Sequence, residues 1–144
     1  MWRGVRQSVE AFNRRDLDAL TPFRDPDFEL HAPHEVVESG LMEPSYRGHE
    51  GYRSYVSEVL GVWGDDMRAE PVELIDLGDR FVLLYNMGVQ ARASGVPLTG
   101  EMATVAVLNG GKTIRQHDYL AHAEALRAAA AAGVGEIAAI RPEQ

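Results

Sequence analysis

The residues with the clearest chemical potential lie together near the end of the chain. Arg115, His117 and Tyr119 alternate there with Gln116 and Asp118, and alternate residues of a strand point to opposite faces of its sheet. An imidazole in an apolar environment beside a guanidinium keeps its neutral form at physiological pH, as a general base requires. If the first set of side chains faces a cavity, this segment is therefore suited to proton transfer.

The turn before this segment indicates which face each set occupies. Residues 109–111, Asn-Gly-Gly, are typical of a two-residue hairpin turn, because type I′ turns need positive φ at both central positions. Either two-residue register gives the same two faces. A three-residue loop would swap the faces and turn Gln116 and Asp118 inward. With the two-residue turn, one face collects Met102, Thr104, Ala106, Leu108, Thr113, Arg115, His117 and Tyr119.

The preceding strand is expected to add apolar groups to that face. If residues 94–97 form a four-residue reversal, Tyr85 and Met87 join it, and we expect the helices to cover it. Arg115 would then need a carboxylate, a carbonyl, a ligand or water, because an unpaired buried guanidinium is costly. A water-accessible cavity would meet that need. The alternative is that the strand ends splay and leave Arg115 and His117 solvated at the rim.

Hydrophobic periodicity indicates the elements that would hold such a cavity. Apolar residues at helical spacing predict an amphipathic helix at the start of the chain, and a wider stripe predicts a helix over residues 52–63. A short helix is expected after Asp16. Residues 32–48 show no periodicity and are expected to form a long irregular loop. Strands are predicted over residues 28–31 and 71–77, then as three long strands over residues 80–120, followed by an alanine-rich helix.

Composition predicts one globular domain. The chain has 144 residues, of which 45% are hydrophobic and 25% charged, and this suits a single core. We place the domain at residues 1–133, with residues 134–144 as a C-terminal tail. The net charge of −8 disfavours nucleic acid and anionic membranes as partners. The first 15 residues lack the continuous apolar run of a leader or a membrane span, so a cytoplasmic location is the default expectation.

Metal and cofactor sites are not expected. The absence of cysteine excludes disulfides, thiolate metal sites and cysteine nucleophiles. His31 and His34 are three residues apart and Glu35 is adjacent to His34. They lie in a strand-to-loop region, however, where the sequence indicates no third ligand that would complete a metal site. The glycine pairs have the setting of turns and lack the strand-to-helix context of a phosphate-binding loop.

Several short motifs, spread over nearly the whole chain, resemble a known family. They are Tyr46-Arg47-Gly48-His49-Glu50-Gly51 before the 52–63 helix, Ala93-Ser94-Gly95-Val96-Pro97, Gly110-Gly111-Lys112-Thr113-Ile114-Arg115, Tyr119 and Ala123-Glu124-Ala125-Leu126. In this order they resemble the SnoaL-like branch of the nuclear transport factor two-like superfamily. The resemblance implies an α+β fold, in which a strongly curved antiparallel sheet wraps around N-terminal helices and one long helix. It also implies a cone with an apolar pocket, commonly in a homodimer.

The resemblance also implies a type of site. The superfamily includes ketosteroid isomerases, polyketide cyclases, limonene-epoxide hydrolases and dehydratases, which place a carboxylate or histidine in an apolar pocket opposite a hydrogen-bond donor. Two acidic positions are changed here. Ala32 stands before Pro33, where steroid isomerases have an aspartate, and Ala121 stands two residues after Tyr119, where many relatives have an acid. His31 and Asp118 are the nearest replacements.

Two functional hypotheses follow. The first is an isomerase, cyclase or hydrolase that acts by proton transfer on an apolar, oxygenated compound such as a polyketide, terpenoid or steroid-like ring. The second is a non-catalytic ligand-binding or dimerisation module. The catalytic candidates are His117, Arg115, Tyr85, His31 and Asp118, and the ligand-binding candidates are Tyr52, Tyr55, Trp63, Met87, Met102 and Tyr119.

The sheet face that carries Val105, Val107 and Ile114 is expected to form a homodimer interface. Several strands contribute apolar groups to that face. It is therefore too apolar to be left in water.

Overall fold

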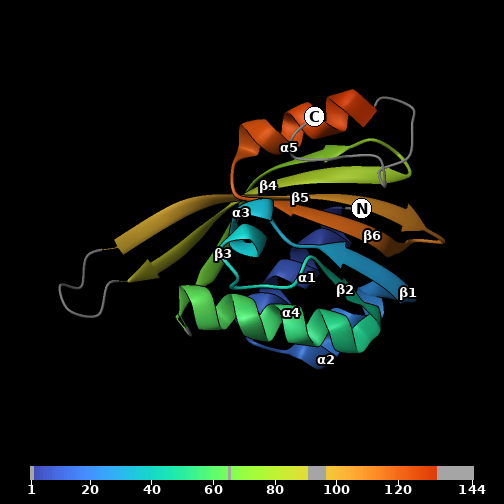
Figure 1. Ribbon diagram of the computed structural model, residues 1–144. Helices are drawn as coiled ribbons and strands as arrows, with labels where there is room; N and C mark the ends of the chain where they lie inside the picture. The colour runs from blue at the N-terminus through green and yellow to red at the C-terminus, as the bar shows by residue number, and fades with distance from the viewer. Residues whose placement is uncertain (1, 65, 91–96, 133–144) are drawn as a thin grey trace.

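The computed structural model describes residues 2–64, 66–90 and 97–132. The elements follow in the order α1 (Trp2–Asn13), α2 (Leu17–Leu20), η1 (Thr21–Phe23), β1 (Arg24–His31), α3 (His34–Glu38), β2 (Ser45–Arg47), α4 (Gly48–Trp63), β3 (Arg68–Asp76), β4 (Arg80–Gln90), β5 (Pro97–Asn109), β6 (Lys112–Tyr119) and α5 (His122–Ala132) (Figure 1). The predicted reversal at residues 94–97 falls largely outside the described residues, and the proposed tail at residues 134–144 falls wholly outside them.

One sheet joins all six strands in the order β2-β1-β6-β5-β4-β3. Four of the neighbouring pairs are antiparallel, but β1 runs parallel to β6. The predicted antiparallel sheet is thus confirmed in the main, and the β1–β6 pair is its parallel member. The α+β class is confirmed, since helices cover a mostly antiparallel sheet. The parallel pairing brings Arg24, at the start of β1, beside Thr113, which follows the last hairpin turn.

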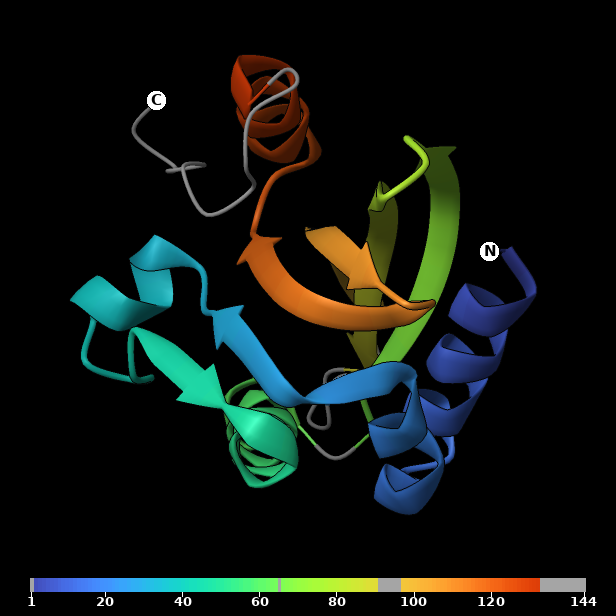
Figure 2. The same ribbon diagram turned by 90° about the vertical axis from the view of Figure 1, so that its right-hand side faces the viewer.

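The sheet separates two hydrophobic clusters. The larger cluster joins residues of α1 and α4 with Phe81, Leu83, Tyr85 and Met87 of β4. The smaller cluster lies on the other face and joins Val82, Leu84, Ala103, Val105 and Tyr119 with Ala125 and Ala128 of α5. Figures 1 and 2 show this division, with α5 on one side of the sheet and α4 on the other. The alternation of side chains along β4 supplies both clusters at once.

The α4 helix behaves as its periodicity predicts. Tyr52, Tyr55, Val56 and Val59 are buried, and Trp63 is partly buried at the C-terminal end. The polar side chains between them face outward, because a single stripe of a helix contacts the core. Phe28 of β1 meets Tyr52 edge to face, with ring centroids 5.7 Å apart. This contact joins α4 to β1.

The segment from Ala32 to Gly48 is more regular than expected. It contains α3 and the short strand β2, which pairs with β1. Pro33 begins α3, since its carbonyl accepts hydrogen bonds from the amides of Val36 and Val37. The two elements contain five and three residues, which is too few for a hydrophobic period to appear in the sequence.

The hairpin turn between β5 and β6 has the predicted type. Gly110 and Gly111 have φ angles of 60° and 81°, and Asn109 pairs with Lys112 across them. These glycines are needed there, because the turn places both central residues in the left-handed region.

From Arg115 onward, however, the side chains of β6 lie on the faces opposite to those that we inferred from this turn. Leu108 pairs with Thr113 and Val107 pairs with Arg115, so Ile114 is an extra residue, a β-bulge, in β6. Beyond it Gln116 and Asp118 share the face of Tyr85, whereas Arg115, His117 and Tyr119 lie on the opposite face. A regular ladder would have put the Arg115 guanidinium against the apolar cluster. One unpaired bulge residue costs less than such burial.

The proposed dimer face is partly covered within the chain. Val105 is fully buried in the α5 cluster, while Val107 packs beside it and remains partly exposed. Part of the apolar surface that motivated a dimer is therefore already removed from water. A homodimer through this face stays a prediction, and light scattering at micromolar concentration tests it. In the described ranges, no helix combines the length and hydropathy needed to span a membrane.

Candidate functional site

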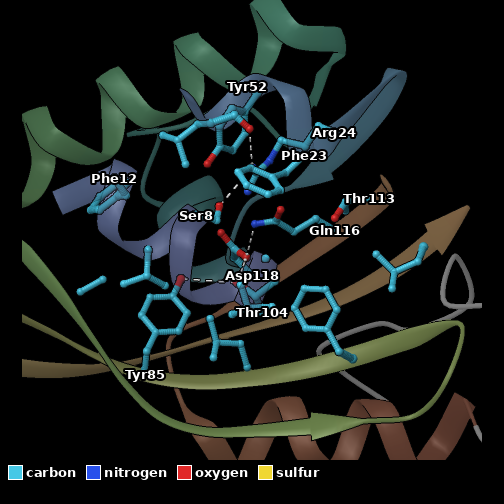
Figure 3. A pocket seen from close by; sticks show the side chains of 18 of the residues that line it. Ser8, Phe12, Phe23, Arg24, Tyr52, Tyr85, Thr104, Thr113, Gln116 and Asp118 are labelled. Atoms are coloured by element: carbon cyan, nitrogen blue, oxygen red, sulfur yellow. Dashed lines mark hydrogen bonds between the residues drawn. The ribbon is translucent and has the colours of Figure 1, made fainter. Parts of the chain in front are cut away.

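A cavity of about 490 Å³ lies between the helices and the sheet face that carries the larger hydrophobic cluster. Apolar side chains of α1, η1 and β4 form most of its wall, and polar groups enter mainly from β1 and β6. Figure 3 shows Arg24 and Tyr52 toward one end and Tyr85 toward the other, with Gln116 and Asp118 between them. A mostly apolar cavity with a few convergent polar groups is typical of a small-molecule site.

Asp118 is the acidic group of this cavity. It is 2% exposed, and the β-bulge in β6 turns it toward α4. Its Oδ2 accepts a hydrogen bond from the Tyr55 hydroxyl at 2.6 Å. Its Oδ1 accepts hydrogen bonds from the Thr104 hydroxyl at 2.7 Å and from the Gln116 side-chain amide at 2.9 Å. These donors come from α4, β5 and β6, so three elements fix the orientation of the carboxyl group.

Burial decides the protonation behaviour of Asp118. Removal of the carboxylate from water raises the pKa of Asp118. The hydrogen bonds from Tyr55, Thr104 and Gln116 oppose this increase, as does the positive charge of Arg24, but burial is the largest effect. The carboxyl group therefore takes up a proton at a higher pH than an exposed aspartate does.

Two tyrosines near Asp118 stay protonated. Burial raises the pKa of Tyr55 and of Tyr85 well above the ordinary value, and the negative charge of Asp118 raises both further. The Tyr55 hydroxyl is committed to Asp118. The Tyr85 hydroxyl lies 3.4 Å from the hydroxyl oxygen of Thr104, which is a long contact. Tyr85 therefore keeps donor capacity for a ligand in the cavity.

Arg24 is the cationic group of the cavity and begins β1. Its guanidinium carbon lies 3.8 Å from the ring centroid of Tyr52, over the aromatic face. Its Nη1 donates a hydrogen bond to the carbonyl oxygen of Leu20 at 3.0 Å. The residue is 9% exposed.

The structure brings together part of the predicted site. Tyr85, Asp118, Tyr52 and Met87 line the cavity, and Tyr55 reaches it through its bond to Asp118. Met102 is buried on the same sheet face without lining the cavity, and Trp63 packs at the end of α4 beside Gly100.

The remaining predicted residues lie on the opposite face of the sheet. Arg115 is exposed there, and Tyr119 is fully buried in the α5 cluster. His31 and His117 are opposite each other in the parallel pair of β1 and β6. Their rings stack with centroids 4.4 Å apart, and His31 Nε2 lies 2.7 Å from Glu29 Oε1. The expectation that Arg115 and His117 point into the cavity was wrong, because the parity argument assumed a hairpin without a bulge.

The sequence interpretation missed Arg24 as a site residue. The available signal was a single arginine directly after Phe23 and four residues before Phe28, where the predicted strand begins. Nothing local distinguished it from the exposed arginines of α1, because its burial depends on tertiary packing under α4.

One group of possible metal ligands lies outside the cavity. A nitrogen of His34 and carboxylate oxygens of Glu35 and Glu124 lie within 4.8 Å of one another. His34 already forms ion-pair contacts with both acids, at 3.5 and 3.6 Å. We treat this group as an ion-pair cluster that links α3 to α5.

Comparison with known families agrees with this architecture. A family model for the SnoaL-like domain matches residues 5–116. The chain belongs to the SnoaL-like family. No curated protein sequence matches this SnoaL-like protein significantly.

Solved structures resemble the SnoaL-like chain over most of its length. An NTF2-like protein of unknown function from Burkholderia pseudomallei is 28% identical, with a TM-score of 0.71, and the match covers 88% of this chain and 94% of that chain. TerC, co-crystallised with polyporic acid, is 26% identical with a TM-score of 0.70, over 84% and 91% of the two chains. IdmH from Streptomyces antibioticus, named as a candidate polyketide cyclase, is 18% identical with a TM-score of 0.64, over 81% and 88%. The last likeness concerns the fold alone.

Proposed function

We propose that this SnoaL-like protein is an acid/base enzyme that acts on an apolar, oxygenated compound of polyketide-like type. The observation that carries the proposal is the buried Asp118 carboxyl group in a mostly apolar cavity, with its pKa raised by burial. A carboxyl group whose pKa moves toward neutral pH suits proton transfer, because it is both ionised often enough to accept a proton and basic enough to hold it. Perturbed carboxyl groups of this kind are concentrated at functional sites.

Asp118 is assigned the role of proton acceptor. A carboxylate offers about four acceptor positions, and three of them are used by Tyr55, Thr104 and Gln116. The remaining position is available for a proton from a carbon next to a substrate carbonyl. Negative charge then develops on the carbonyl oxygen, and the Tyr85 hydroxyl is the neutral donor that stabilises it. In an isomerisation, Asp118 returns the proton to another carbon of the resulting enolate. In a ring closure, the enolate carbon attacks a second carbonyl carbon of the substrate, a C–C bond forms as the π bond of that carbonyl breaks, and Asp118 returns the proton to the alkoxide oxygen so formed.

One relative supports the substrate class. TerC, which is 26% identical, was co-crystallised with polyporic acid. An apolar, oxygenated compound fits the apolar and aromatic wall of the cavity better than a phosphorylated or sugar-like molecule would, because such polar molecules leave many groups unpaired in an apolar site.

The proposal is tested by a screen of apolar ketones, lactones and linear polyketide analogues. With a substrate found in this way, we expect kcat/KM to fall toward acid pH, because protonated Asp118 cannot accept a proton. Since its pKa is raised, the fall should lie above the pH at which an exposed aspartate titrates. A rate that stays constant across that range would remove Asp118 from the role of base.

Tyr55→Phe is expected to raise the pKa of Asp118 further. The Tyr55 hydroxyl stabilises the charged carboxylate, so its removal favours the protonated form. Tyr85→Phe is the matched control, because Tyr85 bonds to Thr104 and not to Asp118. Titration of the aspartate carboxyl ¹³C resonance measures both variants without a substrate. The same pKa for the Asp118 carboxyl group in wild type and in Tyr55→Phe would contradict the expectation.

A binding module without catalysis is the second candidate. The observation that favours it is the complete set of three donors around Asp118, which is also how a structural buried carboxylate is stabilised. The two candidates differ in the same screen. A compound that binds in the cavity but is recovered unchanged over long incubation, among many compounds tested, would favour the binding module.

A further inference from the structure

The cavity holds a buried positive charge, Arg24, that forms no ion pair with a described residue. Arg24 is 9% exposed and lines the cavity. Within the part of the chain that the structure describes, the arginine ion pairs involve Arg14, Arg47, Arg53 and Arg80, and none involves Arg24. A buried guanidinium without a carboxylate partner carries a large desolvation cost.

The existing contacts of Arg24 use only part of its capacity. A guanidinium has five N–H donors. Nη1 donates to the Leu20 carbonyl at 3.0 Å and lies at a marginal 3.5 Å from the Ser8 hydroxyl. Nε is buried and has no hydrogen-bond partner among the described residues. Tyr52 stabilises the charge through its ring face but accepts no N–H bond in that geometry. Nε is covered, so it adds to the cost of burial but is not open to a ligand. Nη2 forms no hydrogen bond with a described residue, so its two donors remain for a group that enters the cavity.

Asp118 does not serve as the missing partner. Its three hydrogen bonds come from Tyr55, Thr104 and Gln116, and it forms no ion pair with Arg24. Arg24 acts on Asp118 through its charge, which lowers the pKa of Asp118 less than each of the three hydrogen bonds does. The N–H donors of Arg24 are therefore not used by Asp118.

We propose that the ligand of this cavity carries an anionic oxygen group, a carboxylate or an acidic enol or phenol, that binds the Arg24 guanidinium. This narrows the substrate class and rests on the proposed function. Guanidinium groups bind planar oxyanions through paired, charge-assisted hydrogen bonds. The apolar rings of such a ligand fill the part of the cavity near Phe12 and Leu83, and its proton-donating position faces Asp118. A neutral steroid-like or terpenoid ring is then a poorer ligand than an acidic aromatic polyketide.

The test compares two probes of nearly equal size, 2-naphthoate and 2-naphthamide, by isothermal titration calorimetry at neutral pH. Wild type is expected to bind the carboxylate about 10- to 100-fold more tightly than the amide, which is the usual strength of a buried charge-assisted hydrogen bond. Arg24→Gln is expected to remove this preference while changing amide affinity by less than about twofold. Arg53→Gln is the matched control, since it removes the same charge from the outer surface, where Arg53 pairs with Asp18.

Each result decides the proposal. A preference that is lost in Arg24→Gln and kept in Arg53→Gln supports it. Equal affinity of wild type for the two probes overturns it, as does a preference that survives in Arg24→Gln or a failure of both probes to bind at about millimolar concentration. If Arg24→Gln does not fold, the comparison of the two probes in wild type still decides.

The test of the anion site can be told apart from the test of the proposed function. Neither probe is a substrate, so their binding does not depend on turnover. Absence of a carboxylate preference in wild type, together with Asp118-dependent turnover, overturns the anion site alone. A clear preference together with turnover that does not depend on Asp118 overturns the proposed role of Asp118 alone.

Discussion

Replacement of Asp118 by asparagine is expected to reduce turnover by about 10²- to 10⁴-fold, the usual contribution of a positioned general base. Asparagine has the same shape but cannot accept the substrate proton. Its carbonyl oxygen can still accept hydrogen bonds from Thr104 and Gln116, and its amide can donate to the Tyr55 oxygen. Steady-state kinetics on a substrate from the screen measures the loss. Asp79→Asn, in the exposed turn before β4, is the control.

Asp118→Asn is also expected to change how the free energy of unfolding depends on pH. Because the pKa of folded Asp118 is raised above its unfolded value, the protonated form contributes stability that is present below the unfolded pKa. That contribution is lost as the pH rises through the folded pKa. The asparagine variant lacks this loss, so its stability relative to wild type should increase from acid to neutral pH. Urea denaturation across that range measures the difference, and a constant difference would show that Asp118 does not titrate differently on folding.

Phe28→Ala is expected to lower the free energy of unfolding by about 3–5 kcal/mol, as for other large-to-small changes in a core. Phe28 is fully buried in β1. It meets the Tyr52 ring edge to face, and the Arg24 guanidinium carbon lies 5.8 Å from its ring centroid. Its loss would therefore leave a void beneath two of the groups that shape the cavity.

A second phenylalanine provides the control for Phe28→Ala. Phe23 borders the cavity and is only partly buried, so part of its surface already lacks protein contacts. Phe23→Ala should cost less than about 2 kcal/mol. Urea denaturation of both variants compares them. Equal losses would indicate that Phe28 is not part of a tightly packed core.

The elements that were predicted correctly are those in which periodicity runs over many residues. The α4 helix and the faces of β4 and β5 follow from long stripes of apolar residues, which a single register satisfies. The short elements α3 and β2 and the parallel pairing of β1 with β6 depend on contacts between distant segments. A sequence pattern contains no direct signal for such contacts.

The site was harder to predict than the fold. Tyr85 was identified as a candidate from the alternation of its strand, Tyr52 from the apolar stripe of its helix, and Asp118 as the nearest replacement for an acid that the resemblance implies. His117 and Arg115 were misplaced, because one bulged residue changes every later face of β6. The choice between the two faces is made by the energy of burying Arg115 or Asp118, and that energy is set by partners such as Tyr55 that lie far away in the chain.

Because Ile114 is an extra residue, the number of residues in β6, as well as their identity, determines which side chains line the cavity. β6 carries two sets of polar side chains on its two faces, and the bulge decides which set the cavity receives. Loss of the bulge at constant length, or insertion of one residue between Ile114 and Arg115, would replace the amide and carboxyl group by a guanidinium and an imidazole. In evolution or in engineering, insertion of a single codon at that point is therefore a direct route to a different acid/base pair, which point substitutions would reach only in several steps.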